Sequence, residues 1–121
     1  MPWSYNQRTG QLSRDGALYG RGYSGHGTGR DNPAMERTPN TGPIPVGTYT
    51  IGAPFTHPHS GSNTMRLTPA EGTNTHGRNG LMIHGDSIAR PGTASQGCVI
   101  LNRHLRDQIW SSGDHTLEVT R

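Results

Sequence analysis

Glycine and proline divide this chain into short segments. The sequence contains 18 glycines and 9 prolines among 121 residues, and only 28% of its residues are hydrophobic. Aromatic residues are nevertheless spread along the chain, and short runs of β-forming residues lie between the turn signals. This pattern predicts a single small, turn-rich and mainly β domain over residues 1–121, with a modest core.

Local patterns predict strands on both sides of a long polar loop. Residues 2–25 are expected to form a meander of two or three strands, and the loop follows at 26–42. Leu105 and Ile109 lie four residues apart on the inner face of a predicted short helix, whose N-cap is Asn102. The helix is expected at 103–110, further strands at 64–69, 80–86 and 115–121, and loops at 53–63 and 70–79. Residues 43–52 are expected to form a turn and then a strand, and residues 95–101 a turn up to Cys98 and then a strand-like apolar run.

The positive charge of the chain comes from arginine alone. All 11 cationic residues are arginines, and the formal net charge is +3. A guanidinium group binds a carboxylate through two parallel hydrogen bonds, so these residues are candidates for carboxylate recognition as well as for a solvated surface. The arginines are scattered and are not interleaved with the few aromatic residues, so we expect no nucleic-acid partner.

The sequence shows neither a secretion signal nor a membrane span. The segment after Met1 lacks the apolar core and the cleavage site of a signal peptide. No run approaches the roughly 20 apolar residues that a spanning helix needs. We expect a protein that is made in the cytoplasm without a signal peptide and that acts as a monomer.

The single cysteine, Cys98, has neighbours typical of a nucleophile. A glycine precedes it and an apolar run follows, in the segment Ser95-Gln96-Gly97-Cys98-Val99. Such a turn exposes a side chain, and it can direct the N–H groups of Gly97 and Cys98 toward the oxyanion of a tetrahedral intermediate. The alternative role for a lone cysteine is that of a small buried hydrophobic residue.

A candidate base, His84, precedes Cys98 by 14 residues. A free thiol has a pKa of about 8.5, so an activating base or cation is required at neutral pH. His84 ends a predicted strand in Ile83-His84-Gly85-Asp86, and the following loop can bring it to Cys98. Either a backbone carbonyl or Asp86 could orient the second ring nitrogen of the histidine.

The order of these motifs resembles that of a known enzyme family. His84-Gly85 followed by the segment from Ser95 to Val99 is similar to the signature of YkuD-type L,D-transpeptidases. From about residue 3 onward, the chain resembles the type VI secretion L,D-transpeptidase effectors. That wider resemblance rests on Trp3 and Tyr5, Tyr23-Ser24-Gly25, Gly42 to Tyr49, Ile83 to Asp86, and Ser95 to Cys98.

The resemblance implies a compact β-sandwich or barrel-like catalytic domain with no metal or other cofactor. It implies that the Cys98 thiolate, with His84 as base, attacks the third residue of a peptidoglycan tetrapeptide stem and that the terminal D-alanine leaves. Water then completes an L,D-carboxypeptidase reaction, whereas a D-amino acid or a second stem gives exchange or cross-linking. Family members poison rival bacteria from the periplasm, so a secretion apparatus and an immunity protein are further expected partners.

Two positions depart from the commoner transpeptidase pattern. Gln96 stands where many members have a second histidine, and Ile100 where many have an arginine that supports the site. Arg78, just before the His84 strand, is the candidate for binding a stem carboxylate. We place Ser95 and Gly97 beside the catalytic pair Cys98 and His84, and we assign Asp86, Gly85 and Gln96, together with Arg78, to substrate binding.

Two other functions stay open from the sequence alone. A non-catalytic peptidoglycan-binding module would keep the groove, but it would need neither Cys98 nor His84. A zinc-dependent wall hydrolase would use histidine ligands, and His57, His59 and His76 are available in addition to His84. His57 and His59 lie in a Gly/Ser/Pro loop without a nearby carboxylate, and we therefore expect no metal.

Overall fold

The computed structural model describes residues 2–121, so that Met1 lies outside the described residues. It is mainly β with one short α-helix, which confirms the predicted fold class. The helix α1 spans Arg103–Ser111, and two single-turn 3-10 helices, η1 (Gly27–Gly29) and η2 (Pro33–Met35), lie in the predicted long loop. The strands are β1 (Trp3–Asn6), β2 (Gln11–Arg14), β3 (Ala17–Arg21), β4 (Tyr23–Ser24), β5 (Gly47–Ile51), β6 (Phe55–His57), β7 (Gly61–Pro69), β8 (Met82–His84), β9 (Val99–Ile100) and β10 (Thr116–Thr120).

The described strands form one mixed sheet. Their order is β3-β2-β1-β10-β5-β7-β8-β9-β4, and β6 pairs with β7. The antiparallel β1-β2-β3 meander is the one predicted from residues 2–25. β1 runs parallel to β10, and β8 runs parallel to β9. The second of these pairs needs a crossover connection, which residues 85–98 supply.

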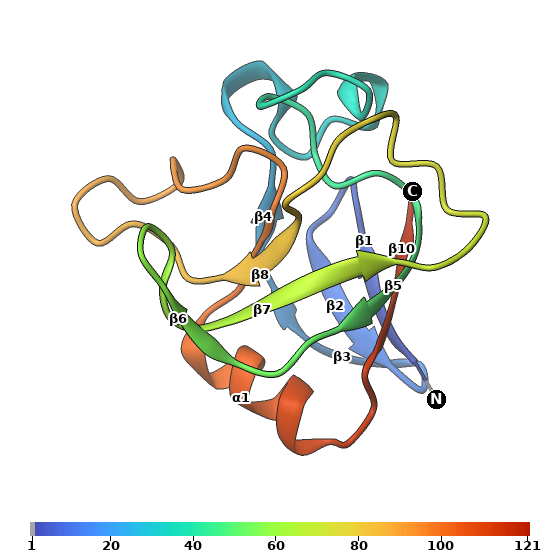
Figure 1. Ribbon diagram of the computed structural model, residues 1–121, viewed down its shortest axis with the longest axis vertical. Helices are drawn as coiled ribbons and strands as arrows, with labels where there is room; N and C mark the ends of the chain where they lie inside the picture. The colour runs from blue at the N-terminus through green and yellow to red at the C-terminus, as the bar shows by residue number, and fades with distance from the viewer. Residues whose placement is uncertain (1) are drawn as a thin grey trace.

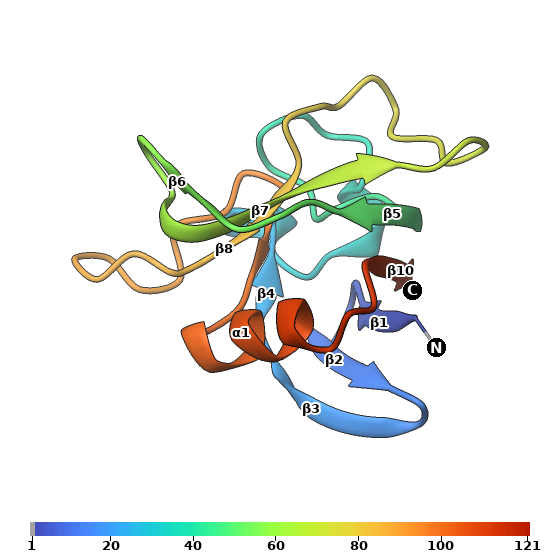
Figure 2. The same ribbon diagram turned by 60° about the horizontal axis from the view of Figure 1, so that its bottom comes forward.

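The sheet curls until its two ends meet. β3 and β4 stand at opposite ends of the strand order, yet only Gly22 separates them in the chain. One bent segment therefore joins the two edges and gives the open sheet a barrel-like form (Figure 1 and Figure 2). The junction requires glycine because a Cβ on Gly22 would lie 1.9 Å from the carbonyl oxygen of Ile100.

The core lies inside this curled sheet. On β5 and β7 the buried residues alternate as predicted, with Tyr49 and Ile51 on one strand and Met65 and Leu67 on the other. Each such side chain contributes about 1.5–3 kcal/mol when fully buried. The other strand and loop members of the core are Trp3, Tyr5, Leu12, Ile44, Leu81, Ile83, Val99, Leu101, Leu117 and Val119.

The helix α1 packs its predicted inner face against the core. Leu105 and Ile109 are both buried, and the side chain of Asn102 caps the helix by accepting a hydrogen bond from the Leu105 N–H at 2.9 Å. Leu105 also covers β3, where a Cβ on Gly20 would lie 2.7 Å from its Cδ1. No helix within residues 2–121 is long and apolar enough to cross a membrane.

Two segments differ from their sequence predictions. Residues 53–63, expected as a loop, contain β6 and the start of β7. The ring nitrogen Nδ1 of His57 accepts hydrogen bonds from the N–H groups of His59 and Ser60, each at 3.1 Å, and so closes this hairpin with a side-chain turn. The strand expected at 80–86 is shorter in the structure, where β8 spans only Met82–His84.

Candidate active site

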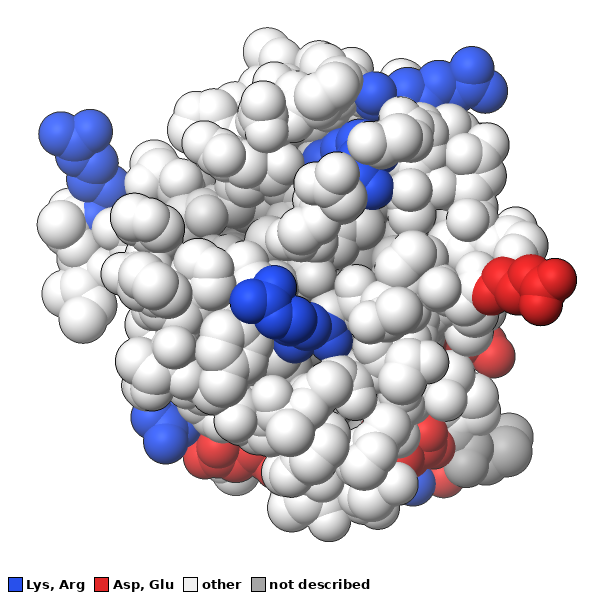
Figure 3. Space-filling model, viewed as in Figure 1, with Lys and Arg blue, Asp and Glu red and all other residues white. Residues whose placement is uncertain are grey.

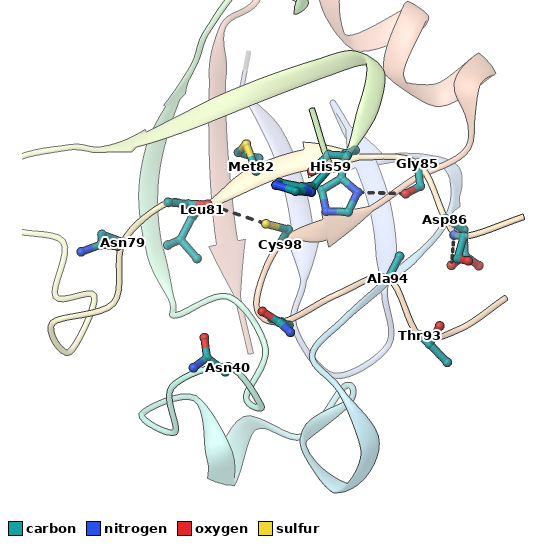
Figure 4. A pocket seen from close by; sticks show the side chains of 15 residues that line it. Asn40, His59, Asn79, Leu81, Met82, Gly85, Asp86, Thr93, Ala94 and Cys98 are labelled. Carbon is teal, nitrogen blue, oxygen red and sulfur yellow. Dashed lines mark hydrogen bonds between the residues drawn. The ribbon is translucent and has the colours of Figure 1, made fainter. Parts of the chain in front are cut away.

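A cavity of about 560 Å³ opens beside β8 and the turn before β9. Its volume falls within the range of small-ligand sites, about 300–1,000 Å³. In Figure 4, Cys98 lies near the middle of the wall, with Asn79 and Asn40 to one side and Gly85 and Asp86 to the other. The full lining is Asn40, His59, Ser60, Asn79, Gly80, Leu81, Met82, His84, Gly85, Asp86, Ser87, Thr93, Ala94, Gln96 and Cys98.

His84, at the end of β8, has one ring nitrogen fixed by the backbone. Its Nδ1 lies 2.8 Å from the carbonyl oxygen of Gly85. A carbonyl only accepts hydrogen bonds, so Nδ1 carries the proton of the neutral ring and Nε2 keeps a free lone pair. Of the two partners considered from the sequence, the backbone carbonyl and not Asp86 orients the ring.

Burial lowers the pKa of His84, and the nearby positive charge of Arg106 lowers it further, against an opposing contribution from the Gly85 carbonyl. Desolvation disfavours the imidazolium ion because a buried charge loses its hydration. The histidine therefore remains neutral, and able to accept a proton, to lower pH than an exposed histidine.

The register of β8 and β9 places His84 and Cys98 on the same face of the sheet. Ile83 pairs with Val99, and both of these side chains point into the core. Side chains alternate along each strand, so the residue after Ile83 and the residue before Val99 both point to the opposite face, where the cavity lies. Neighbouring strands lie about 4.8 Å apart and rise about 3.3 Å per residue, which puts the Cα atoms of His84 and Cys98 about 8 Å apart. The two side chains together can span this separation.

Cys98 is half-buried in the cavity wall. Its sulfur lies 3.8 Å from the carbonyl oxygen of Gly80 (Figure 4). Burial raises the pKa of the thiol, whereas a hydrogen bond from the Met82 backbone and the positive charge of Arg78 oppose this rise. Burial therefore favours the uncharged form of both groups, the thiol of Cys98 and the neutral imidazole of His84.

The turn before Cys98 is held by two buried serine hydroxyls. Ser95 Oγ donates to the Cys98 carbonyl oxygen at 2.6 Å and accepts from the N–H groups of Gly25 and Gly97. Ser24 Oγ, from β4, donates to the Gly97 carbonyl oxygen at 3.2 Å. Ser95 is fully buried, so in this structure it stabilises the turn and does not reach the cavity.

The two N–H groups expected to face an oxyanion differ in availability. The Gly97 N–H donates to Ser95 Oγ at 3.1 Å and is therefore used within the turn. The Cys98 N–H has no acceptor among residues 2–121. Only the second of these groups is free to donate to an incoming carbonyl oxygen.

Arg78 does not have the position expected of a group that binds a substrate carboxylate. Its side chain is buried, and both terminal nitrogens donate to backbone carbonyl oxygens. The acceptors are Glu36 and Pro43, each at 2.7 Å, Gly42 at 2.9 Å and Gln96 at 3.2 Å. Arg78 therefore links the long loop at 26–42 to the turn that carries Cys98.

Asp86 is exposed, but its carboxylate binds other groups of the protein. It accepts a hydrogen bond from Tyr23 Oη at 2.6 Å and from the N–H groups of Ser87 and Gly92. Tyr23 Oη in turn accepts from the Ala94 N–H at 3.0 Å. Although burial alone would raise it, the pKa of Asp86 is lowered by these hydrogen bonds, and the pair fixes the crossover loop along one side of the cavity.

A second buried arginine, Arg106 of α1, was not foreseen from the sequence. Its Nη1 donates to the carbonyl oxygens of Ser62 and Asn63, and a Cβ on Gly85 would lie 2.8 Å from its Nη2. Arg106 therefore packs directly behind the segment that orients His84. The helical pattern of the sequence places Arg106 among the polar residues of α1 and does not predict its burial.

Several polar cavity residues come from loops that the sequence did not connect with the site. These residues are Asn40, Asn79, His59 and Ser60. They line the cavity together with Gln96, which was predicted from the sequence and is exposed. No sequence signal distinguishes these residues from other loop residues, because the tertiary fold alone brings their loops together. Within residues 2–121, no three histidine, cysteine, aspartate or glutamate residues are grouped so that they could hold a metal ion.

The arrangement suits acyl transfer through a thioester. A histidine nitrogen with a free lone pair and a thiol share one cavity wall, and one backbone N–H is available there to donate to an oxyanion. On the face shown in Figure 3, the arginines lie apart from one another and do not form a continuous basic patch.

Comparison with protein families agrees with the position of these motifs. The family model of the Tlde1 domain matches residues 20–120, a range that includes both His84 and Cys98. A search of curated proteins finds no match. Because the family match covers most of the sequence, the chain belongs to the Tlde1 domain family, that of type VI secretion effectors with L,D-transpeptidase-like activity.

Proposed function

We propose that this protein is a cysteine-dependent L,D-carboxypeptidase and L,D-transpeptidase that acts on peptidoglycan tetrapeptide stems. The observation that carries the proposal is the position of His84 and Cys98 on one cavity wall, with the protonated Nδ1 of His84 bound to the Gly85 carbonyl. This arrangement leaves Nε2 as the base and Sγ as the nucleophile. A module that only binds the cell wall would require neither group.

Acylation begins when His84 Nε2 accepts the proton of Cys98 Sγ. The sulfur then bonds to the carbonyl carbon of the third stem residue, and the π electrons of that carbonyl move to its oxygen. The Cys98 N–H stabilises the resulting oxyanion. When the intermediate collapses, the bond to D-alanine breaks, the D-alanine nitrogen takes the proton from Nε2, and a thioester remains on Cys98.

Deacylation determines the product. Water gives a proton to His84 Nε2, attacks the thioester and releases a tripeptide, after which the sulfur regains its proton. The amine of a free D-amino acid gives an exchanged tetrapeptide by the same steps, and the amine of a second stem gives a cross-link. Access of water and of amines to the cavity decides between these outcomes.

The polar lining of the cavity supports a peptide substrate. Asn40, Asn79 and Gln96 contribute amide side chains that both donate and accept hydrogen bonds, and Ser60 and Thr93 contribute hydroxyls. These groups match the alternating N–H and C=O groups of an extended peptide. As a member of an effector family, the protein would meet such stems in the periplasm of a target bacterium, and an immunity protein would protect the producing cell.

The test is mass spectrometry of purified tetrapeptide muropeptides after incubation with the wild type, Cys98→Ala and His84→Ala. We expect the wild type to remove the terminal alanine, or to replace it when a D-amino acid is added. Each variant should lose this activity while its circular dichroism spectrum stays native. His104→Ala, at an exposed position on α1 outside the cavity, is the matched control and should remain fully active. Full activity in the Cys98 variant contradicts the proposal.

A further inference from the structure

The guanidinium group of Arg78 lies beneath the turn that carries the nucleophile. A Cβ on Gly97, the residue before Cys98, would lie only 2.1 Å from Arg78 Nη2. The same nitrogen donates to the carbonyl oxygen of Gln96. The planar end of Arg78 therefore contacts the backbone of this turn directly.

This buried positive charge is not neutralised by an ion pair. Within residues 2–121, no carboxylate lies at ion-pair distance from Arg78, and the four acceptors of its hydrogen bonds are neutral carbonyl oxygens. The nearby carboxylate of Glu36 instead binds Gln7, Val46 and His76. A buried cation without an ion-pair partner is costly, and an anion that forms close by offsets part of this cost.

The reaction proposed above forms such an anion at Cys98. The sulfur passes through a thiolate, and the first intermediate carries an oxyanion beside the Cys98 N–H. The positive charge of Arg78 opposes the rise in the pKa of the thiol that burial causes. The other titratable residues that line the cavity are His59, His84 and Asp86. Burial lowers the pKa of His84 and so favours its neutral form, and the Asp86 carboxylate is bound by Tyr23.

We propose that Arg78 is a positioning residue that holds the Cys98 turn against the loop at 36–43 and stabilises the anionic states of the sulfur by its buried charge. This inference rests on the proposed function and replaces the substrate-binding role expected for Arg78 from the sequence. Arg78 has no free terminal N–H left for a substrate carboxylate, since its two terminal nitrogens already make four hydrogen bonds.

The experiment measures the titration of the thiol without any substrate. Cys98 is the only cysteine, so the rate of alkylation by iodoacetamide as a function of pH reports its pKa directly. Arg78→Met should raise this pKa, and a pKa higher by about one should slow alkylation about tenfold at a pH well below both values. Arg78→Lys should restore much of the lost rate because it keeps the charge. Arg103→Met, which removes an exposed arginine of α1, should match the wild type.

Turnover of tetrapeptide muropeptides provides the second readout. Arg78→Met should lower kcat and leave KM nearly unchanged, because the residue acts on the sulfur and not on the bound peptide. If Arg78→Met does not fold, as judged by circular dichroism, Arg78→Gln replaces it, since glutamine keeps hydrogen-bond donors without the charge.

Two results would overturn the inference. One is an unchanged thiol titration in a folded neutral variant, whatever its turnover. The other is a raised KM with kcat and the titration both unchanged, which would return Arg78 to substrate binding. The alkylation assay needs no peptidoglycan, so it remains decisive even if the wild type shows no turnover and the proposed function itself fails.

Discussion

Replacing Gly97 by alanine should disrupt the turn that carries Cys98. The backbone of Gly97 has a φ of +131°, a conformation that residues with a Cβ rarely adopt. The added methyl group would also lie 2.1 Å from Arg78 Nη2. The guanidinium group must then move, and the hydrogen bonds at stake are those of Nη2 to the carbonyl oxygens of Gly42 and Gln96, of which we count the loss of one.

The two costs can be estimated separately. The backbone conformation costs about 1–3 kcal/mol for a residue other than glycine. Loss of a hydrogen bond from a charged donor costs about 1.5–3 kcal/mol. We therefore expect Gly97→Ala to lower the free energy of unfolding by about 2.5–6 kcal/mol. For a domain of this size the corresponding fall in Tm is about 10–25 °C.

Thermal unfolding followed by circular dichroism measures this effect, and Gly72→Ala is the matched control. Gly72 also has a positive φ, +88°, but a Cβ there would meet no atom within 4 Å. That substitution should cost about 1–2 kcal/mol, the backbone contribution alone. Equal losses in the two variants would refute the reasoning, because they would show that the Arg78 contact with the turn contributes nothing to stability.

Three further expectations concern the same site. Ser95→Ala leaves the buried N–H groups of Gly25 and Gly97 without their acceptor and should destabilise the fold by about 2–4 kcal/mol in urea denaturation, whereas Ser111→Ala on the exposed helix surface should change little. Tyr23→Phe removes the hydrogen bond to Asp86 and should lower kcat/KM about tenfold while far-ultraviolet circular dichroism stays native; unchanged kinetics would contradict a role for this pair in fixing the crossover loop. The acid limb of the pH profile of kcat/KM should have its midpoint below 6.5, because burial lowers the pKa of His84 and the base stays neutral until the pH falls through that lowered pKa. A midpoint above 6.5 would contradict the burial of His84 in the free enzyme.

The sequence predicts the elements that depend on local pattern. The alternating residues of β5 and β7 and the spacing of Leu105 and Ile109 on α1 identify strands and a helix that the structure contains. The short β6 was missed because its hairpin is closed by the ring of His57, and a histidine is not a usual turn signal.

The geometry of the site depended on contacts that are distant in the chain. The partners of Arg78 are carbonyl oxygens, which every residue possesses, so nothing in the sequence marks Glu36 or Gly42 as its acceptors. For the same reason the sequence could not show that the Ser95 hydroxyl accepts the hydrogen bond of the Gly97 N–H. The family resemblance indicates candidate residues, and the fold shows which of their hydrogen-bonding groups remain free.

The most direct test of the central claim is detection of the acyl-enzyme. Tetrapeptide muropeptide is mixed with the protein, the reaction is stopped with acid, and a trypsin digest is analysed by tandem mass spectrometry. Trypsin does not cleave between Arg90 and Pro91, so one peptide, residues 79–103, carries both His84 and Cys98.

We expect a tripeptide stem, without the terminal alanine, in thioester linkage to Cys98, and its absence in Cys98→Ala. Release of alanine by the wild type with no adduct on Cys98, or an adduct that persists in Cys98→Ala, would contradict the proposed chemistry.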